Sequence, residues 1–192
     1  EDFISILPSS SELKLQLEQV IASGKNNMME LKTILDHHFA PGSIDVNIMT
    51  KIDKDNFIDD EQLPVIYNDA HAALRGFVNS TTNSSVVFSA GMNPRLYSYM
   101  ESFNEFYPNT NGQFQKRIIL KVSDFRSAMI QGNFLAKKGL WVSEYRIESG
   151  LNCGGHAFAT DGLLLGPILE EFKQKKAQLI QSAHELMVKS LE

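Results

Sequence analysis

Three features are scarce in this sequence, and each scarcity excludes a class of protein. Only one of the 192 residues is a cysteine, which excludes an intrachain disulfide framework and favours a reducing compartment. No apolar run reaches the ~18 residues of a membrane-spanning helix, so no membrane partner is expected. The net charge is −5 and no basic run occurs, which argues against a nucleic-acid partner. We therefore expect a cytoplasmic protein that acts on a small molecule.

The remaining composition is that of an ordinary globular protein. Apolar residues make up 43% of the chain and charged residues 21%, and 192 residues are enough for one domain with a full core. The sequence predicts a single α/β domain over residues 1–192. In it, residues 1–42 form a helical N-terminal segment and residues 43–192 repeat βα units.

Short apolar runs alternate with segments of helical periodicity after residue 42. Four runs are predicted to be strands: Val46 to Ile52, Ser85 to Ser89, Arg117 to Val122 and Leu140 to Ile147. The predicted N-caps of the helices are Ser9, Asn68, Asn93 and Ser123. Gly166-Pro167 opens a long C-terminal helix that buries Ile168, Phe172, Leu179, Ala183 and Leu186. This alternation favours a parallel sheet with right-handed crossovers.

Polar residues follow each of the predicted strands. In a parallel sheet the carboxyl ends of the strands meet at one edge, where the sites of such folds lie. The residues expected there are Lys51, Asp53, Ser89, Gly91, Lys121, Ser123, Asp124, Glu148, Cys153 and His156. Strands end in polar residues in most proteins. These residues therefore form either a functional site or an ordinary set of strand ends, and the sequence alone leaves both interpretations open.

The glycine-rich segment Glu148 to His156 is the densest of these strand ends. Gly154 and Gly155 let backbone N–H groups approach a ligand, and Cys153 and His156 lie beside them. Their C-x-x-H spacing offers two zinc ligands, but the chain has no second cysteine, and zinc is not expected. A nucleophilic Cys153–His156 pair stays open as an alternative. We expect His71, in a predicted helix, to be a surface or helix-packing residue.

Lys121 interrupts the apolar run Arg117 to Val122. A lysine in such a run must reach the edge of the sheet or pair with a carboxylate. A fixed cation near a strand end can stabilise negative charge on a reduced cofactor or an oxyanion. The alternative is an ion pair with Asp124 or with a carboxylate of a neighbouring strand.

One part of the chain resembles a segment of the FMN-dependent (β/α)8-barrel oxidoreductases. It consists of the predicted strand and Ser-Asp at Arg117 to Asp124, a helix, the strand near Trp141 and the Gly-Gly-His of residues 154–156. The most similar members are the nitronate monooxygenase-like enzymes and the flavin domain of glutamate synthase. The resemblance covers residues 116 to 172 and implies FMN as cofactor, with Lys121 facing the flavin. It also implies that Gly154, Gly155 and His156 lie near the flavin or its phosphate.

The expected fold is therefore α/β, with parallel strands that form part of a (β/α)8 barrel, and the alternative is a small doubly wound three-layer sheet. The expected function is that of an FMN-dependent oxidoreductase, with His156, Lys121 and Cys153 as catalytic residues. The expected cofactor-binding residues are Lys121, Gly154, Gly155, His156 and Gly91, and the backbone N–H of Gly91 would be a further hydrogen-bond donor to the phosphate. The alternative is a non-catalytic α/β fragment or interaction domain without a cofactor. Because a full barrel takes about 250 residues, we expect a piece of a longer protein that binds FMN weakly or not at all.

Overall fold

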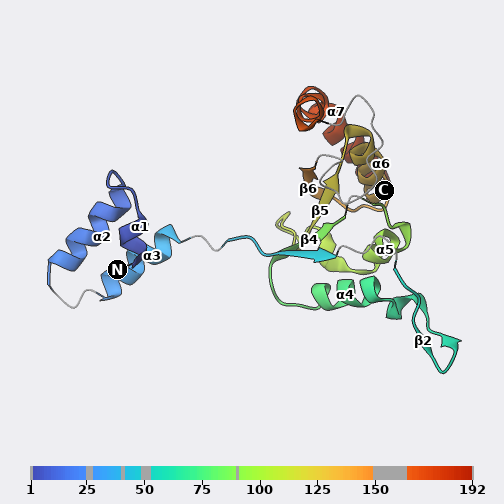
Figure 1. Ribbon diagram of the computed structural model, residues 1–192, viewed down its shortest axis with the longest axis horizontal. Coiled ribbons are helices and arrows are strands. Elements are labelled where there is room, and N and C mark those ends of the chain that lie inside the picture. The colour runs from blue at the N-terminus through green and yellow to red at the C-terminus, as the bar shows by residue number, and fades with distance from the viewer. Residues whose placement is uncertain are drawn as a thin grey trace. The chain divides into compact units, whose positions relative to one another are not determined.

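The computed structural model describes residues 2–24, 28–39, 42–48, 53–89, 91–148 and 164–191. The chain divides into two compact units, Glu1–Gly42 and Ser43–Glu192 (Figure 1). The boundary falls where the sequence changes from helical to alternating periodicity.

The first unit consists of the helices α1 (Asp2–Ile6), α2 (Glu12–Ala22) and α3 (Met28–His38). The N-cap of α2 is Ser11, whose hydroxyl accepts a hydrogen bond from the Lys14 N–H, and the prediction of Ser9 was wrong. The reason is local: the Ser11 N–H donates to the Pro8 carbonyl at 2.9 Å, so a turn takes up the two residues between them and delays the helix.

Four parallel strands form the sheet of the second unit. They are β1 (Asp45–Ile48), β4 (Ser84–Phe88), β5 (Lys116–Val122) and β6 (Val142–Ile147), in the order β1-β4-β5-β6. The predicted α/β alternation with a parallel sheet is therefore confirmed. Each strand neighbours the next one along the chain, so the reversal of order that a doubly wound sheet needs is absent from these four described strands.

A helix follows each strand of the sheet along the chain, and these helices lie along one side of the strands (Figure 1). They are α4 (Asp69–Val78), α5 (Pro94–Tyr99), α6 (Phe125–Ala136) and α7 (Leu165–Leu191), with short 3-10 turns η1 (Val65–Tyr67), η2 (Met100–Ser102) and η3 (Asn104–Phe106). A two-residue hairpin, β2 (Phe57–Ile58) and β3 (Glu61–Gln62), lies between β1 and α4. No helix in the described part of the chain is long and apolar enough to cross a membrane.

Alternate residues of each strand face the helices and form the core. They are Val86 and Phe88 on β4 and Ile118, Leu120 and Val122 on β5, all at most 2% exposed. Each such side chain contributes about 1.5–3 kcal/mol of transfer free energy. On α7, four of the five residues predicted to be buried are so, and Leu186 is half-buried.

The helix caps follow the sequence in part. Asn93 caps α5 as predicted, accepting from the Leu96 N–H at 3.1 Å. Helix α6 is capped by Asp124, which accepts from the Ser127 N–H at 2.6 Å, and the prediction of Ser123 was wrong. Strand β5 ends at Val122 and two residues are needed to turn, so the helix begins one residue later than the prediction allowed.

The two edge strands meet through side chains on the face opposite the core. Arg146 on β6 donates from Nη2 to Asp45 Oδ2 on β1 at 2.6 Å. In a flat sheet these strands would lie about 14 Å apart, because neighbouring strands are ~4.8 Å apart. The contact therefore requires the sheet to curve, with Asp45 and Arg146 on its concave face. Hydrogen bonds to Glu144 and Asp45 raise the pKa of the Arg146 guanidinium.

Candidate functional site

The candidate site lies at the carboxyl ends of the strands, which we call the carboxyl rim. Side chains alternate along a strand, so Ser89 and Lys121, each one residue beyond the paired core residues Phe88 and Leu120, lie on the concave face. Glu148 follows β6 on the same face as Arg146, two residues later. Three neighbouring strands thus direct polar side chains to one place.

Lys121 and Glu148 form an ion pair at this rim. The Lys121 Nζ lies 2.7 Å from Glu148 Oε1, and the two side chains are 20% and 26% exposed. Lys121 is paired in register with Arg146, and the Glu148 N–H continues the ladder by donating to the Val122 carbonyl at 2.9 Å. Of the alternatives that the sequence left open, an ion pair with a neighbouring strand's carboxylate is therefore the one found.

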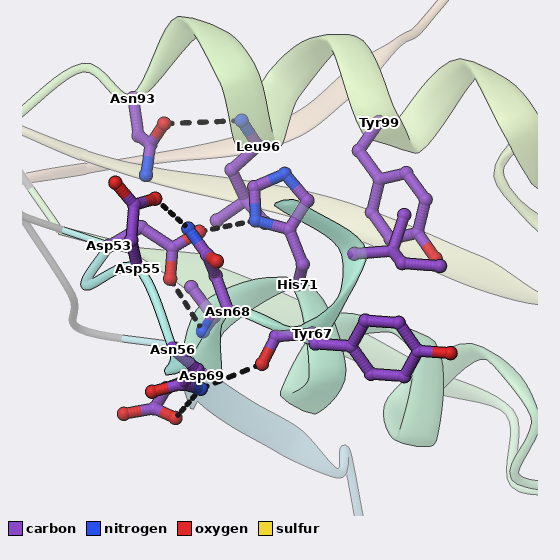
Figure 2. Close-up of polar contacts among 12 residues, drawn as sticks. Asp53, Asp55, Asn56, Tyr67, Asn68, Asp69, His71, Asn93, Leu96 and Tyr99 are labelled. Carbon is purple, nitrogen blue, oxygen red and sulfur yellow. Dashed lines mark hydrogen bonds and ion pairs between the residues drawn. The ribbon is translucent and has the colours of Figure 1, made fainter. Parts of the chain in front are cut away.

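A buried hydrogen-bonded pair, Asp53–His71, lies beyond the end of β1. Asp53 Oδ2 contacts His71 Nδ1, and the two side chains are 5% and 2% exposed. The other oxygen, Asp53 Oδ1, accepts from the Ala70 N–H at 2.9 Å (Figure 2). Asn68 occupies the N-cap position of α4 as predicted, but its side chain makes no capping bond. Asp53 supplies that bond from 17 residues earlier in the chain.

The sequence did not identify the role of His71. Of the two predicted alternatives, a surface or a helix-packing residue, the second is found: His71 is buried and its ring lies 5.0 Å from that of Tyr99 on α5. The bond to Asp53 was not predicted. The one available signal was the helix itself: a capped helix that follows a strand begins at the carboxyl rim, where Asp53 was expected.

Amide side chains hold the acidic loop in front of α4. Asn68 Nδ2 donates to Asp55 Oδ1 at 3.0 Å, and Asn56 Nδ2 donates to Asp69 Oδ1 at 3.1 Å. Asn68 is 0% exposed, and its Oδ1 has no hydrogen-bond partner among the residues that the structure describes. An unsatisfied buried acceptor costs about 1–3 kcal/mol. The described residues contain no group of His, Cys, Asp and Glu arranged to hold a metal ion.

Several predicted site residues fall outside the described part of the chain. These are Lys51, Cys153, Gly154, Gly155 and His156. The expected contact of Lys121 with the Gly154–His156 segment therefore stays a prediction. Gly91 lies in the loop between β4 and α5, two residues before the cap Asn93.

The opposite end of the sheet holds a charged residue that the sequence did not single out. Lys116, the first residue of β5, is 0% exposed, and its Nζ donates to Ser80 Oγ at 2.8 Å and to Ser84 Oγ at 3.2 Å. It also donates to the Thr82 carbonyl and lies 4.8 Å from the centre of the Phe77 ring. Burial lowers the pKa of Lys116, and the charge of Glu105 opposes this shift. Lys116 on β5 thus holds the turn that precedes β4 in place through hydrogen bonds.

Comparison with known proteins adds no relative. No protein-family model matches the chain, and neither the curated proteins nor the solved structures contain a match.

Proposed function

We propose that the carboxyl rim binds FMN and that this chain belongs to an FMN-dependent oxidoreductase of the (β/α)8-barrel type, acting on a small molecule. The main support is the position of Lys121. Its ammonium group lies at the carboxyl rim on the concave face, next to Glu148 of the neighbouring strand. The resemblance to the flavin barrels implies a flavin-facing lysine at this residue.

The curvature of the sheet supports the barrel part of the proposal. Four strands in chain order form a sheet curved enough for Asp45 and Arg146 to touch. On the concave face, Val87 and Ile119 are 0% and 2% exposed, as side chains that fill the interior of a narrow barrel are.

The described residues fit one side of a flavin. The Lys121–Glu148 pair is partly exposed, and such pairs contribute about 0–1 kcal/mol, so an anionic ligand can replace Glu148 at the ammonium. Lys121 would then stabilise negative charge on the flavin ring, and the Ser89 hydroxyl on the next strand would offer a hydrogen bond. FMN itself supplies the redox chemistry when it is bound. The phosphate donors expected at Gly154 and Gly155 lie outside the described residues.

The test is a titration of FMN into the ¹⁵N-labelled chain, followed by amide chemical shifts. Weak binding suffices for this method, which matters because weak binding is expected. We expect saturable shifts confined to residues at the carboxyl ends of β4, β5 and β6. Lys121→Met should weaken binding by about tenfold, the equivalent of one charge-assisted hydrogen bond.

Lys138→Met is the matched control. Lys138 is 20% exposed and ion-paired, like Lys121, but its partner Glu101 follows α5, away from the carboxyl rim. This variant should bind FMN as the wild type does. Shifts that do not saturate, or that centre on another part of the sheet, contradict the proposal and favour the alternative of an interaction domain without a cofactor.

A further inference from the structure

The segment of residues 53–69 carries the whole net charge of the chain. Its one basic residue is Lys54, and its six acidic residues are Asp53, Asp55, Asp59, Asp60, Glu61 and Asp69. The net charge of the segment is thus −5, equal to that of all 192 residues, and the rest of the chain is neutral as a whole. The structure describes every residue of the segment, which forms the hairpin of β2 and β3 and the turn η1 before α4.

Half of these carboxylates have no partner. Asp53, Asp55 and Asp69 accept hydrogen bonds at the base of the hairpin, as described above. Asp59, Asp60 and Glu61 lie at its tip and are exposed. Within the part of the chain that the structure describes, these three carboxylates make no ion pair. Their charge is therefore available to another molecule.

The same segment exposes a cluster of large apolar side chains. Phe57 and Ile58 lie on β2, where successive side chains face opposite sides of the strand. Val65, Ile66 and Tyr67 form the turn η1. All five side chains are between 39% and 60% exposed. Single exposed apolar residues are common on protein surfaces, whereas an apolar cluster beside charged residues is typical of an interaction site.

Hydrogen bonds hold this surface in place. Asn56 Nδ2 donates to the Tyr67 carbonyl at 2.8 Å, which joins the start of the hairpin to η1 (Figure 2). The Leu63 N–H donates to the Asn56 carbonyl at 2.8 Å and closes the hairpin. Arg75 on α4 donates from Nη1 to the Ile66 carbonyl at 2.7 Å. A partner therefore meets a surface that needs little further ordering, which lowers the entropic cost of binding.

We propose that residues 57–67, which we call the acidic hairpin surface, bind a basic amphipathic helix of another protein. The carboxylates at the tip would face lysine or arginine side chains, and the exposed apolar side chains would contact the apolar stripe of the helix. Each strand of the hairpin has only two residues, so an added strand would gain few backbone hydrogen bonds. The inference goes beyond FMN binding and does not depend on it.

Charge selects this occupant among the alternatives. Nucleic acids and anionic lipid surfaces have the same sign of charge as the hairpin tip. A second copy of the chain has a net charge of −5 as well. The first unit, residues 1–42, contains six acidic and three basic residues, so it does not offer the required positive charge either. A basic segment of another protein is the occupant with complementary charge.

The first test is a titration of the ¹⁵N-labelled chain with a synthetic helical peptide of leucine and lysine, followed by amide chemical shifts. We expect saturable shifts at the acidic hairpin surface and a dissociation constant of about 10 µM, as for a small transient interface. A peptide of the same design with glutamate in place of lysine should not bind. Phe57→Thr with Ile58→Thr should weaken binding about tenfold, because threonine keeps the strand propensity but removes apolar area. Ile130→Thr, on α6, is the matched control and should bind normally.

The second test removes the charge at the tip. Asp59→Asn, Asp60→Asn and Glu61→Gln are combined in one variant. Asparagine suits the left-handed φ values of 47° and 66°, so the turn is kept. We expect the lysine peptide to bind this variant about tenfold more weakly and with less dependence on salt.

The matched control changes the net charge equally in another place. Glu170→Gln, Glu171→Gln and Glu185→Gln lie on α7, far from the hairpin (Figure 1), and should leave peptide binding unchanged. Shifts centred on another surface, or equal weakening by both triple variants, would overturn the proposal. So would a wild-type dimer that the Phe57→Thr and Ile58→Thr variant dissociates, because a second copy would then be the occupant. Self-association of the neutral-tip variant with unchanged peptide affinity would show that the charges only protect the hairpin from pairing, which also contradicts the proposal.

Discussion

The two lysines of strand β5, Lys116 and Lys121, differ in burial, in the face of the sheet on which they lie and in the type of partner. Lys116 starts the strand on the helix side, is 0% exposed and donates to neutral oxygens. Lys121 lies near the other end on the concave face, is 20% exposed and contacts a carboxylate. Buried donors in a network are costly to remove, whereas exposed ion pairs contribute little. At the amino end of the sheet Lys116 is thus a structural residue, whereas at the carboxyl end Lys121 and Glu148 stay accessible to solvent.

Truncation of the two lysines should separate them most clearly. We expect Lys116→Ala to lower the free energy of unfolding by about 4 kcal/mol, because it opens a cavity and leaves buried oxygens without a donor. Lys121→Ala should lower it by less than about 1 kcal/mol. Urea unfolding followed by circular dichroism measures both. Equal losses would show that the two ends of the sheet do not differ in this way.

Replacing Asp53 tests whether the buried Asp53–His71 pair at the carboxyl rim stabilises the fold. Asp53→Asn keeps an acceptor for the Ala70 N–H but removes the charge that faces the buried His71. We expect a loss of about 2 kcal/mol, the contribution of a hydrogen bond to a charged group. Glu148→Gln, the same change in the partly exposed pair, is the control and should have a much smaller effect. A loss at Glu148 as large as that at Asp53 would contradict the distinction.

The interaction energy of the partly exposed pair Lys121–Glu148 should depend on salt concentration. Because the Debye length falls from about 10 Å at 0.1 M to 3 Å at 1 M, added salt should weaken the Lys121–Glu148 attraction. The coupling energy of the two residues, from a double-mutant cycle with Lys121→Met and Glu148→Gln, should be at most about 1 kcal/mol in low salt and smaller at 1 M. A coupling that salt does not change would mean that the pair is shielded from solvent.

The smallest expected effect is a pH dependence. Burial lowers the pKa of Lys116 below its ordinary value of about 10.4. Between the lowered and the ordinary pKa the unfolded chain binds more protons than the folded one, so this residue makes stability rise with pH. Urea midpoints measured from neutral pH upward should rise less in Lys116→Met than in the wild type. An identical slope in both proteins would contradict the assigned cause.

The sequence predicts the sheet well because period and chain order are local signals. Four apolar runs separated by helical segments leave few alternatives to a parallel sheet, and the strand exits follow from the same pattern. Individual partners are not local. The sequence singled out Lys121, which interrupts the apolar run, but it could not identify the partners of either lysine. The partners of Lys116 come from a turn 32 to 36 residues earlier, and the partner of Lys121 follows the next strand.

Asp53 and His71 illustrate the same limit at the site. The sequence placed Asp53 at the carboxyl rim but gave it no partner, because the hairpin that returns the chain to α4 has only two residues in each strand. Such short strands give no periodic signal. The turn that joins the two strands of this hairpin is visible only in the backbone, where Asp59 and Asp60 adopt φ values of 47° and 66°. That left-handed turn brings the start of α4 back to Asp53.

The Asp45–Arg146 contact bears on the order of events in folding. It joins residues 101 positions apart, and closing a loop of that length directly costs about 4 kcal/mol of chain entropy. Each neighbouring strand pair closes a shorter loop, so the strands assemble one after another before the two edges meet. We therefore expect the ion pair to form after the rate-limiting barrier of folding. Asp45→Asn should accordingly speed unfolding and leave the refolding rate unchanged. The contact would thus slow the unfolding of the sheet without helping it to fold.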